Sequence, residues 1–315
     1  MEHYVTLFDS LFLPQGIALH LSLERHAKPY TLWILCIDKE AFRVLQRLDL
    51  PNMRLLQIDE IEGPELKQAK ESRSRVEYCW TLTPFTPRFV FDADPTAARV
   101  TYVDADMWFR KNPAPIFREY ENSRKSVLIT DHSYAAEYDY SFTSGQYCVQ
   151  FITFGRITSE KVRKWWEERC LEWCYARYED GKFGDQFYLD QWPTLFAPDV
   201  HILLDKELIL APWNASRFPY GRSVCWHFHG LRIVPGGRKE RFAVDCGDYP
   251  IPQTTMTYVY REYLKDLQSA LSLIRSADAR IRPQRKPSLP RRAKNSIFGY
   301  RNQVWRCLIH KRLPL

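Results

Sequence analysis

The sequence predicts an α/β fold with a mixed, mostly parallel sheet flanked by helices. Two observations lead to this prediction. In the first half of the chain, runs of β-branched and aromatic residues alternate with segments of helical periodicity. In addition, 45% of the 315 residues are hydrophobic, including 18 Tyr, 18 Phe and 10 Trp, which is enough for a substantial core. Such alternation is typical of parallel strands joined by helices.

The predicted elements follow one another in regular order. The first five elements are three strands, at 4–8, 31–38 and 53–59, and the two helices between them, at 17–26 and 40–48. Three more strands are predicted at 99–106, 126–132 and 148–155. The rest of the folded part is expected to contain a long helix at 161–178, a strand at 223–231 and a helix at 257–275.

The end of the chain differs in composition from the rest. A stretch rich in proline and basic residues at 282–294 breaks all periodicity and marks a linker. After Asp278 the chain has eleven Arg and Lys and no acid, so the net charge of +7 divides into +11 for this segment and −4 for residues 1–278. We therefore expect one folded domain at 1–278 and a basic linker and tail at 279–315.

Alternating apolar and basic residues at 297–313 are typical of a helix that lies on an anionic membrane surface. A solvated tail and a nucleic-acid-binding arm are the alternatives for this segment, although we expect no specific nucleic-acid partner. The N-terminus has no pattern of a secretory signal, and no stretch approaches the roughly 20 apolar residues that span a bilayer. The expected location is the cytoplasm, with possible peripheral contact with the membrane, and with reduced thiols at the eight cysteines. Cys170 and Cys174 share a helical face without a second ligand pair nearby, so we expect them to be packing residues.

Two pairs of aspartates are each separated by one residue. Asp104 and Asp106 follow the strand-like run VTYV and precede the apolar run MWF, whereas Asp92 and Asp94 lie in the turn-like sequence FDADP. Carboxylates at the carboxyl end of a parallel strand lie where α/β sheets bind ligands. They suit Mg²⁺ or Mn²⁺, which completes its coordination shell with substrate phosphates. The first pair therefore predicts a metal site and the second a solvated turn.

A third metal ligand is predicted in the sequence WHFHG. His227 and His229 alternate there at the spacing that places both side chains on one face of a strand. Imidazole in a mixed set with carboxylates favours Mn²⁺ over Mg²⁺. We expect His227 to be the third ligand, with His229 as the alternative.

Four sequence features together resemble the GT-A fold glycosyltransferases, particularly the glycogenin and lipopolysaccharide galactosyltransferase group, which includes bacterial nucleotide-diphospho-sugar transferases. They are YCWTLTP at 78–84, YVDAD at 102–106, FGDQFYLDQW at 183–192 and HFHG at 227–230. These features occur in the family's order, and the resemblance covers roughly residues 3–235.

This resemblance implies a Rossmann-like GT-A fold and an enzyme that transfers a sugar from a nucleotide-diphosphate donor, with UDP-sugar favoured. The implied acceptor is a cell-surface glycan or a lipid-linked molecule, as in lipopolysaccharide or polysaccharide biosynthesis. Asp104 and Asp106 would hold Mn²⁺ (or Mg²⁺) against the diphosphate, with the metal-binding histidine at His227. Asp185 and Gln186 match the pair beside the donor sugar and are the catalytic candidates. The candidates for donor contacts are Tyr4, Asp9, Arg75, Tyr78, Asp104 and Ala105.

The chain also departs from the family's pattern. Cys148 and Gln150 stand where Asn-x-Gly is common beside the sugar, so sugar recognition is expected to differ. The family's donor-contacting lysine falls near Val76, which leaves Arg73 or Arg75 as substitutes. The family is retaining, but the sequence leaves the anomeric outcome open. A helix N-cap remains an alternative role for Asp185 and Gln186.

Other classes of protein are alternatives to a glycosyltransferase. A phosphatase of the haloacid dehalogenase type also has two aspartates after a strand, in the pattern DxDx[TV] near the start of its core domain. Here Met107 and Trp108 follow the pair, which lies roughly a hundred residues into the chain. A non-catalytic membrane- or nucleic-acid-binding protein is the other alternative.

Overall fold

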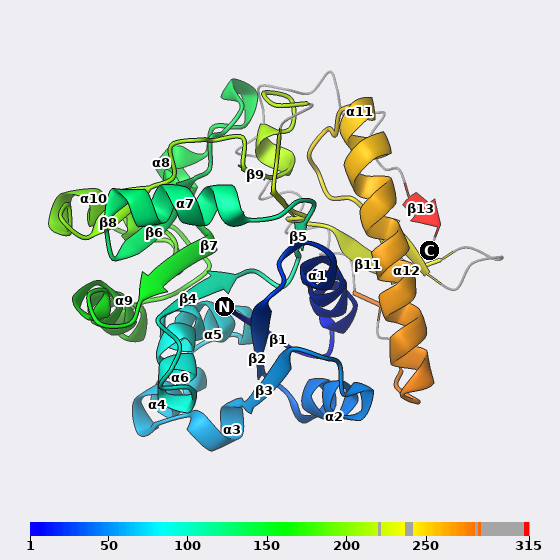
Figure 1. The fold of residues 1–315 in the computed structure, drawn as a ribbon, viewed down its shortest axis with the longest axis horizontal. Coiled ribbons are helices and arrows are strands. Elements are labelled where there is room, and N and C mark those ends of the chain that lie inside the picture. Colours follow the sequence, from blue (N-terminus) through cyan, green and yellow to red (C-terminus); the bar gives the residue numbers. More distant parts are fainter. Residues whose placement is uncertain (220–221, 237–241, 281–282, 285–311, 315) are drawn as a thin grey trace.

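The computed structural model describes residues 1–219, 222–236, 242–280, 283–284 and 312–314. A seven-stranded sheet forms the centre of this part of the chain (Figure 1). Its strands lie in the order β3-β2-β1-β4-β7-β6-β8. Their bounds are β1 (Glu2–Phe8), β2 (Tyr30–Cys36), β3 (Met53–Gln57), β4 (Arg99–Val103), β6 (Val127–Asp131), β7 (Tyr147–Gly155) and β8 (Val200–Ile202).

Strand direction in this sheet is mixed. β7 runs antiparallel to its neighbours β4 and β6, whereas the other adjacent pairs are parallel. The predicted mixed, mostly parallel sheet is confirmed. Because β1, β2 and β4 are parallel, their carboxyl ends meet at one edge, where Asp9, Asp38 and Asp104 follow them.

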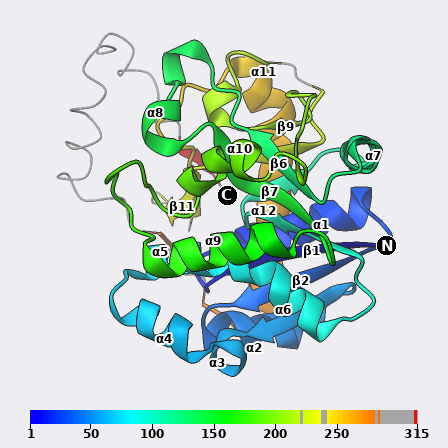
Figure 2. The ribbon, with the colours of Figure 1, turned by 90° about the vertical axis from the view of Figure 1, so that its left-hand side faces the viewer.

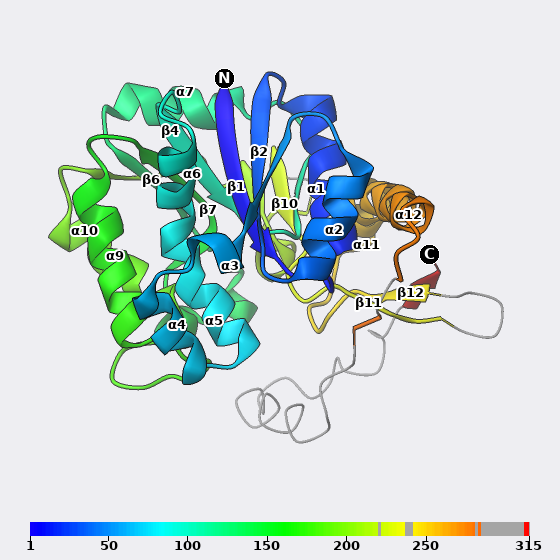
Figure 3. The same cartoon turned by 90° about the horizontal axis from the view of Figure 1, so that it is seen from below.

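Two helical layers cover the faces of the sheet (Figure 3). The first layer consists of α1 (Leu13–His26), α2 (Lys39–Leu48), α7 (Ala114–Ser123) and α12 (Arg261–Ser276). The second consists of α3 (Ile58–Ile61), α4 (Pro64–Glu71), α5 (Arg75–Leu82), α6 (Thr86–Ala93), α9 (Glu160–Glu172) and α10 (Trp192–Leu195). Helices α6 and α9 both belong to the second layer (Figure 2). An ion pair of 3.1 Å between Arg88 and Glu167 joins them.

The central strands of the sheet are mostly apolar because both of its faces are buried there. In β1, Tyr4 and Phe8 point into the core beneath α1, whereas Val5 and Leu7 point into the core beneath α5 and α6. The same alternation of side chains continues in β2. A strand of this kind has few polar side chains until it ends, and the polar residues that follow it therefore collect at the edge of the sheet.

Two smaller sheets extend the structure beside α1 and α12. The first has the order β5-β10-β9, with β5 (Met107–Phe109), β9 (Ile209–Leu210) and β10 (Cys225–His227). The second contains β11 (Arg232–Pro235), β12 (Phe242–Asp245) and β13 (Arg312–Pro314). The remaining short elements are α8 (Ser141–Ser144), α11 (Gln253–Thr255), 3₁₀ turns at Thr83–Phe85, Ala136–Tyr138, Phe187–Gln191 and Pro212–Asn214, and a π-helical turn at Met256–Tyr260.

Helix α12 fixes β5 relative to α1. Asp266 of α12 accepts hydrogen bonds from Arg25 of α1, at 3.0 Å to one carboxylate oxygen, and from the indole N–H of Trp108 in β5, at 2.6 Å. The ionised carboxylate strengthens both bonds. The helix predicted at 257–275 is confirmed, although its first residues form the π-helical turn.

The helix predicted at 161–178 is wrong in its last third. Helix α9 ends at Glu172, and Trp173 takes an extended backbone conformation with φ −152° and ψ 122°. The carbonyl of Trp173 accepts a hydrogen bond of 2.8 Å from the hydroxyl of Tyr188, so a tertiary contact ends the helix there. Cys170 and Cys174 are fully buried free thiols, as expected of packing residues.

The predicted turn is confirmed for Asp94 but is wrong for Asp92, which belongs to helix α6. Asp92 is exposed near the end of α6, and the carboxylate of Asp94 accepts hydrogen bonds from the backbone N–H of Thr96, at 2.9 Å, and from its hydroxyl, at 2.6 Å. This is an Asx turn, which needs no ligand to form.

Most of the predicted basic tail at 279–315 lies outside the described residues. Where it is described, it contacts the rest of the chain. Gln284 is buried, and its backbone N–H donates to the carbonyl of Ile233 at 2.7 Å. Strand β13 pairs antiparallel with β12. Among the helices of the described residues, none has the length and apolar character needed to cross a bilayer.

Candidate active site

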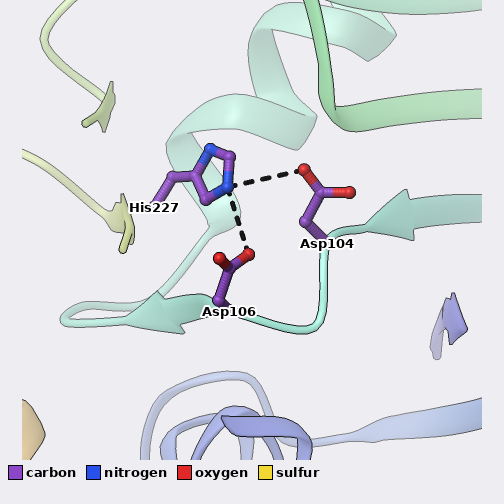
Figure 4. Close-up of side chains that lie close together, drawn as sticks. All are labelled: Asp104, Asp106 and His227. Atoms are coloured by element: carbon purple, nitrogen blue, oxygen red, sulfur yellow. Dashed lines mark ion pairs between the residues drawn. The ribbon is translucent and has the colours of Figure 1, made fainter. Parts of the chain in front are cut away.

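Asp104, Asp106 and His227 converge at the carboxyl edge of the central sheet (Figure 4). The Nε2 atom of His227 lies 3.1 Å from Oδ1 of Asp106 and 3.5 Å from Oδ2 of Asp104. One ligand atom from each of the three residues lies within 4.8 Å of the others. Two carboxylate oxygens and one imidazole nitrogen form a donor set that suits Mn²⁺, so the residues present fit the predicted metal.

The two aspartates meet because the chain turns after β4. The backbone N–H of Met107 donates to the carbonyl of Asp104 at 3.0 Å, and β5 begins at Met107. In the antiparallel pair β5–β10, Met107 lies opposite His227. The backbone N–H of Phe228 then donates to the carbonyl of Asp106 at 2.9 Å. The two carboxylates are therefore brought together by this turn, and not by a continuation of the strand predicted at 99–106.

The charges of the three side chains depend on one another. Burial would lower the pKa of His227, but Asp106 and Asp104 outweigh it, so the pKa of His227 is raised. Burial and the charge of Asp106 raise the pKa of Asp104, whereas His227 beside Asp106 lowers the pKa of Asp106 despite its burial. In the absence of a cation, the two carboxylates thus favour the protonated form of His227. Metal binding at this site would therefore release a proton.

His229 lies at the rim of this group. Its side chain is exposed, and its ring centroid is 5.5 Å from that of His227. Strand β10 ends at His227, and the chain turns at Gly230 with φ +78°, so strand spacing does not continue to His229. The structure thus places His227, and not His229, in the group of three.

Asp185 is buried beside the three side chains. It is 3% exposed, and its Oδ2 atom has no hydrogen-bond partner among the residues that the structure describes. Burial, together with the charge of Asp104, raises the pKa of Asp185 to about 7. The indole N–H of Trp166 donates to the carbonyl of Asp185 at 2.8 Å and holds its backbone. Before it, Gly184 has φ +55° and leaves no room for a Cβ, which would lie 3.2 Å from the ring of Trp80.

Gln186 connects the Asp185 segment to α8. Its side-chain amide donates to the carbonyl of Ser144 at 2.6 Å. Gln186 precedes the 3₁₀ turn Phe187–Gln191, but its side chain makes no capping hydrogen bond there. The N-cap alternative for Gln186 is therefore wrong.

A second group of charges follows β1 and β2. The Nε atom of Arg75, in α5, is 2.7 Å from a carboxylate oxygen of Asp9, and its Nη2 atom is 2.8 Å from Asp38. Asp38 also accepts hydrogen bonds from the backbone N–H and the hydroxyl of Ser10. Our sequence predictions missed Asp38, although its position as the last residue of the predicted strand at 31–38 was a usable signal.

The other predicted donor-binding residues, apart from Asp104, are buried. Tyr4 is fully buried and packs edge-on against Phe109. Tyr78 is buried in the second layer, and its hydroxyl donates to Glu62. Ala105 is buried between the two aspartates of the turn.

Of the two arginines proposed to replace the family's lysine, Arg75 faces the edge with a side chain that is 53% exposed. Arg73 is buried, and its guanidinium donates to the carbonyl of Leu171 at 2.6 Å. The structure therefore makes Arg75 available to a ligand, whereas Arg73 binds the last turn of α9.

We expect Asp185→Asn to stabilise the metal-free protein at alkaline pH. The pKa of Asp185 is raised above its ordinary value of 3.8 to about 7, so between these values the folded state binds more protons than the unfolded state. The contribution of protonated Asp185 to the free energy of unfolding should be fully present below about pH 4. It should be lost as pH rises through 7, by at most about 4 kcal/mol. Asparagine removes this cost. Thermal unfolding with a chelator should show a higher Tm for the variant at pH 8 and little difference at pH 4; equal shifts at both pH values would contradict this account.

The structure has the fold of the GT-A glycosyltransferases. Among solved structures, the galactosyltransferase LgtC in complex with donor and acceptor sugar analogues matches 85% of this chain and 95% of its own chain, with a TM-score of 0.53 and 12% identity. No model of a known protein family matches the chain.

Relatives in sequence define a narrower family for this chain than the fold does. YfnF of Bacillus subtilis (strain 168), an uncharacterised protein, is 30% identical over 293 residues, which span 87% of this chain and 94% of YfnF. YfnD of the same strain is 28% identical over 291 residues, which span 87% of this chain and 91% of YfnD. The protein belongs to the family of YfnF.

Proposed function

We propose that this protein is a metal-dependent glycosyltransferase that uses a nucleotide-diphosphate sugar, with UDP-sugar favoured, and a glycan or lipid-linked acceptor. The observation that carries this proposal is the convergence of Asp104, Asp106 and His227 at the carboxyl edge of a GT-A sheet, next to the buried carboxyl of Asp185. A structural relative with donor and acceptor sugar analogues supports the same class of ligands.

Different residues of the chain are proposed to contact the nucleoside diphosphate and the sugar of the donor. Asp104, Asp106 and His227 would hold Mn²⁺ or Mg²⁺ at the diphosphate. The bound ion would stabilise the negative charge that develops on the leaving nucleoside diphosphate. Arg75, at the ends of β1 and β2, is placed to contact the nucleotide side, where Asp9 and Asp38 are its present partners.

Asp185 and Gln186 are proposed to act at the sugar. The free Oδ2 atom of Asp185 is an acceptor without a protein partner in the described structure, so it can face the positive charge that develops at the anomeric carbon. Gln186 holds α8 next to the same point through Ser144. Retention of configuration is part of this proposal, because a carboxylate in this place can stabilise a short-lived cationic intermediate on one face of the sugar.

A thermal-shift panel tests the proposal directly. UDP-, GDP- and CMP-sugars are each added with and without Mn²⁺, because a ligand that binds the native state raises its Tm by mass action. We expect a UDP-sugar to raise the Tm in the presence of Mn²⁺ and to do so far less with a chelator. Hydrolysis of the same donor then establishes turnover. Phosphate release from simple esters without any donor response would instead favour the phosphatase alternative.

The basic residues between 285 and 311 are proposed to provide affinity for anionic membranes and no catalysis. Because Gln284 and β13 contact the folded unit, neutralising charges is a cleaner test than removing the tail. Replacing Arg291, Arg292, Lys294, Arg301 and Arg306 by glutamine should lower binding to anionic vesicles by about 1,000-fold or more, since each basic residue near the surface contributes about 1 kcal/mol. Donor hydrolysis should stay unchanged. Unaltered vesicle binding would remove the membrane contact from the proposal and with it the support for a peripheral cytoplasmic location.

A further inference from the structure

Gln150 stands at a position where the family's pattern commonly has a glycine, and its side chain contacts one of the predicted metal ligands. The side chain is 1% exposed on β7, and its Oε1 atom lies 2.8 Å from Nδ1 of His227. Its backbone carbonyl accepts a hydrogen bond of 3.2 Å from the N–H of Asp104. One residue therefore contacts two of the three predicted metal ligands.

Through these contacts Gln150 links two sheets. Gln150 lies in the central sheet and Asp104 directly follows one of its strands, whereas His227 ends β10 of the sheet β5-β10-β9. His227 is 4% exposed, so its ring is enclosed, but few polar atoms fix its rotation. The hydrogen bond to Gln150 supplies that restraint on the side of the ring away from the carboxylates.

The amide oxygen of Gln150 can only accept a hydrogen bond, so Nδ1 of His227 must carry the proton. In the neutral ring the lone pair is then on Nε2, the atom that faces Asp106 and Asp104. The opposite tautomer would point an N–H at the place of the metal and could not bind it. Residues that hydrogen-bond to a metal-binding histidine without contacting the metal fix its tautomer and orientation. Their loss commonly costs 10- to 100-fold in metal affinity.

We propose that Gln150 is a positioning residue that holds His227 in the metal-binding tautomer and orientation. The inference rests on the proposed metal site, but its central element, the proton on Nδ1, exists in the metal-free protein. A glutamine at this position thus serves the metal centre. The same assignment explains why a long polar side chain is buried in β7.

The test compares three variants of the full chain. Gln150→Leu keeps the volume and removes the acceptor, Gln150→Glu keeps an acceptor for Nδ1–H, and Gln146→Leu changes an exposed glutamine just before β7 as the control. Mn²⁺ affinity is measured by titration calorimetry without donor. Gln150→Leu should lose about 10- to 100-fold in affinity, whereas Gln150→Glu and Gln146→Leu should bind Mn²⁺ at least as well as the parent. Parent-like affinity of Gln150→Leu, or equal losses in the leucine and glutamate variants, would overturn the proposal.

The tautomer is read separately in the metal-free protein. Long-range ¹H–¹⁵N spectra of histidine-labelled protein at alkaline pH, with His227→Asn to identify the signal, should show the proton of His227 on Nδ1 in the parent. In Gln150→Leu this signal should shift toward the Nε2–H tautomer. A parent with the proton on Nε2 would refute the inference. A parent that has the Nδ1 proton but binds no divalent ion would instead refute the proposed metal-dependent function and leave the role of Gln150 in orienting the ring intact.

Discussion

Asp104→Asn is expected to abolish metal-dependent binding of the nucleotide-sugar donor. The substitution removes a negative charge from a group that has two carboxylates and one imidazole to offer a divalent ion. An amide oxygen binds such an ion far more weakly than a carboxylate does. The loss of affinity should exceed the roughly 10- to 100-fold that the loss of an outer-shell partner costs. Titration calorimetry with UDP-sugar and Mn²⁺ measures the effect.

Two matched substitutions control for the general effect of removing a carboxylate. Asp92→Asn changes an exposed residue at the end of α6, and Asp94→Asn changes the acceptor of an Asx turn. Both variants should bind donor and Mn²⁺ as the parent does. If Asp104→Asn bound them equally well, the metal site would be wrongly assigned, and most of the proposed transferase activity would lose its support.

Asp185→Asn and Gln186→Ala are expected to lose turnover by about 100- to 1,000-fold while donor affinity changes little, since that is the usual effect of removing one group that stabilises a transition state. Both residues are proposed to act at the sugar, whereas the metal group acts at the diphosphate. Measured together, kcat for donor hydrolysis and the Kd of the donor separate these roles. For Asp185→Asn the loss should accompany the higher Tm at alkaline pH, so an inactive variant would be more stable than the parent.

Asp190→Asn is the control for this second experiment. Asp190 lies in the same 3₁₀ turn, but its carboxylate accepts hydrogen bonds from the backbone N–H groups of Gln146 and Tyr147. We expect this variant to be less stable but to keep its turnover per folded molecule. Should Asp185→Asn behave in the same way, the role of Asp185 would be structural.

The sequence predicted the central sheet well because local patterns determine it. Alternating strands and helices, and the polar residues at strand ends, are visible in any short window of such a chain. Asp104, Asp106 and His227 could be chosen in this way, whereas Asp185 was chosen from the resemblance to GT-A enzymes. The end of α9 could not be predicted, because the hydrogen bond from Tyr188 to Trp173 joins residues whose contact depends on the complete fold.

For the site, residue types alone could not decide which candidates face a ligand. Tyr4 and Tyr78 belong to segments that approach the edge of the sheet, yet their side chains point into the two cores. Arg73 and Arg75 differ by two positions, and packing buries one and exposes the other. The direction of a side chain depends on which face of an element is covered, and this is settled only when the layers come together.

By itself, the sequence determined the class of fold, the carboxylate pair and the histidine that could bind a metal, because these depend on short patterns and on the chemistry of single side chains. The tertiary structure decided how they meet. A turn after β4 joins Asp104 to Asp106, the β5–β10 pairing brings His227 to them, and burial beside Asp104 raises the pKa of Asp185. It also brought Gln150 to the ring of His227. The physical reason is that distance, burial and mutual charge arise between segments far apart in the chain, and no local pattern encodes them.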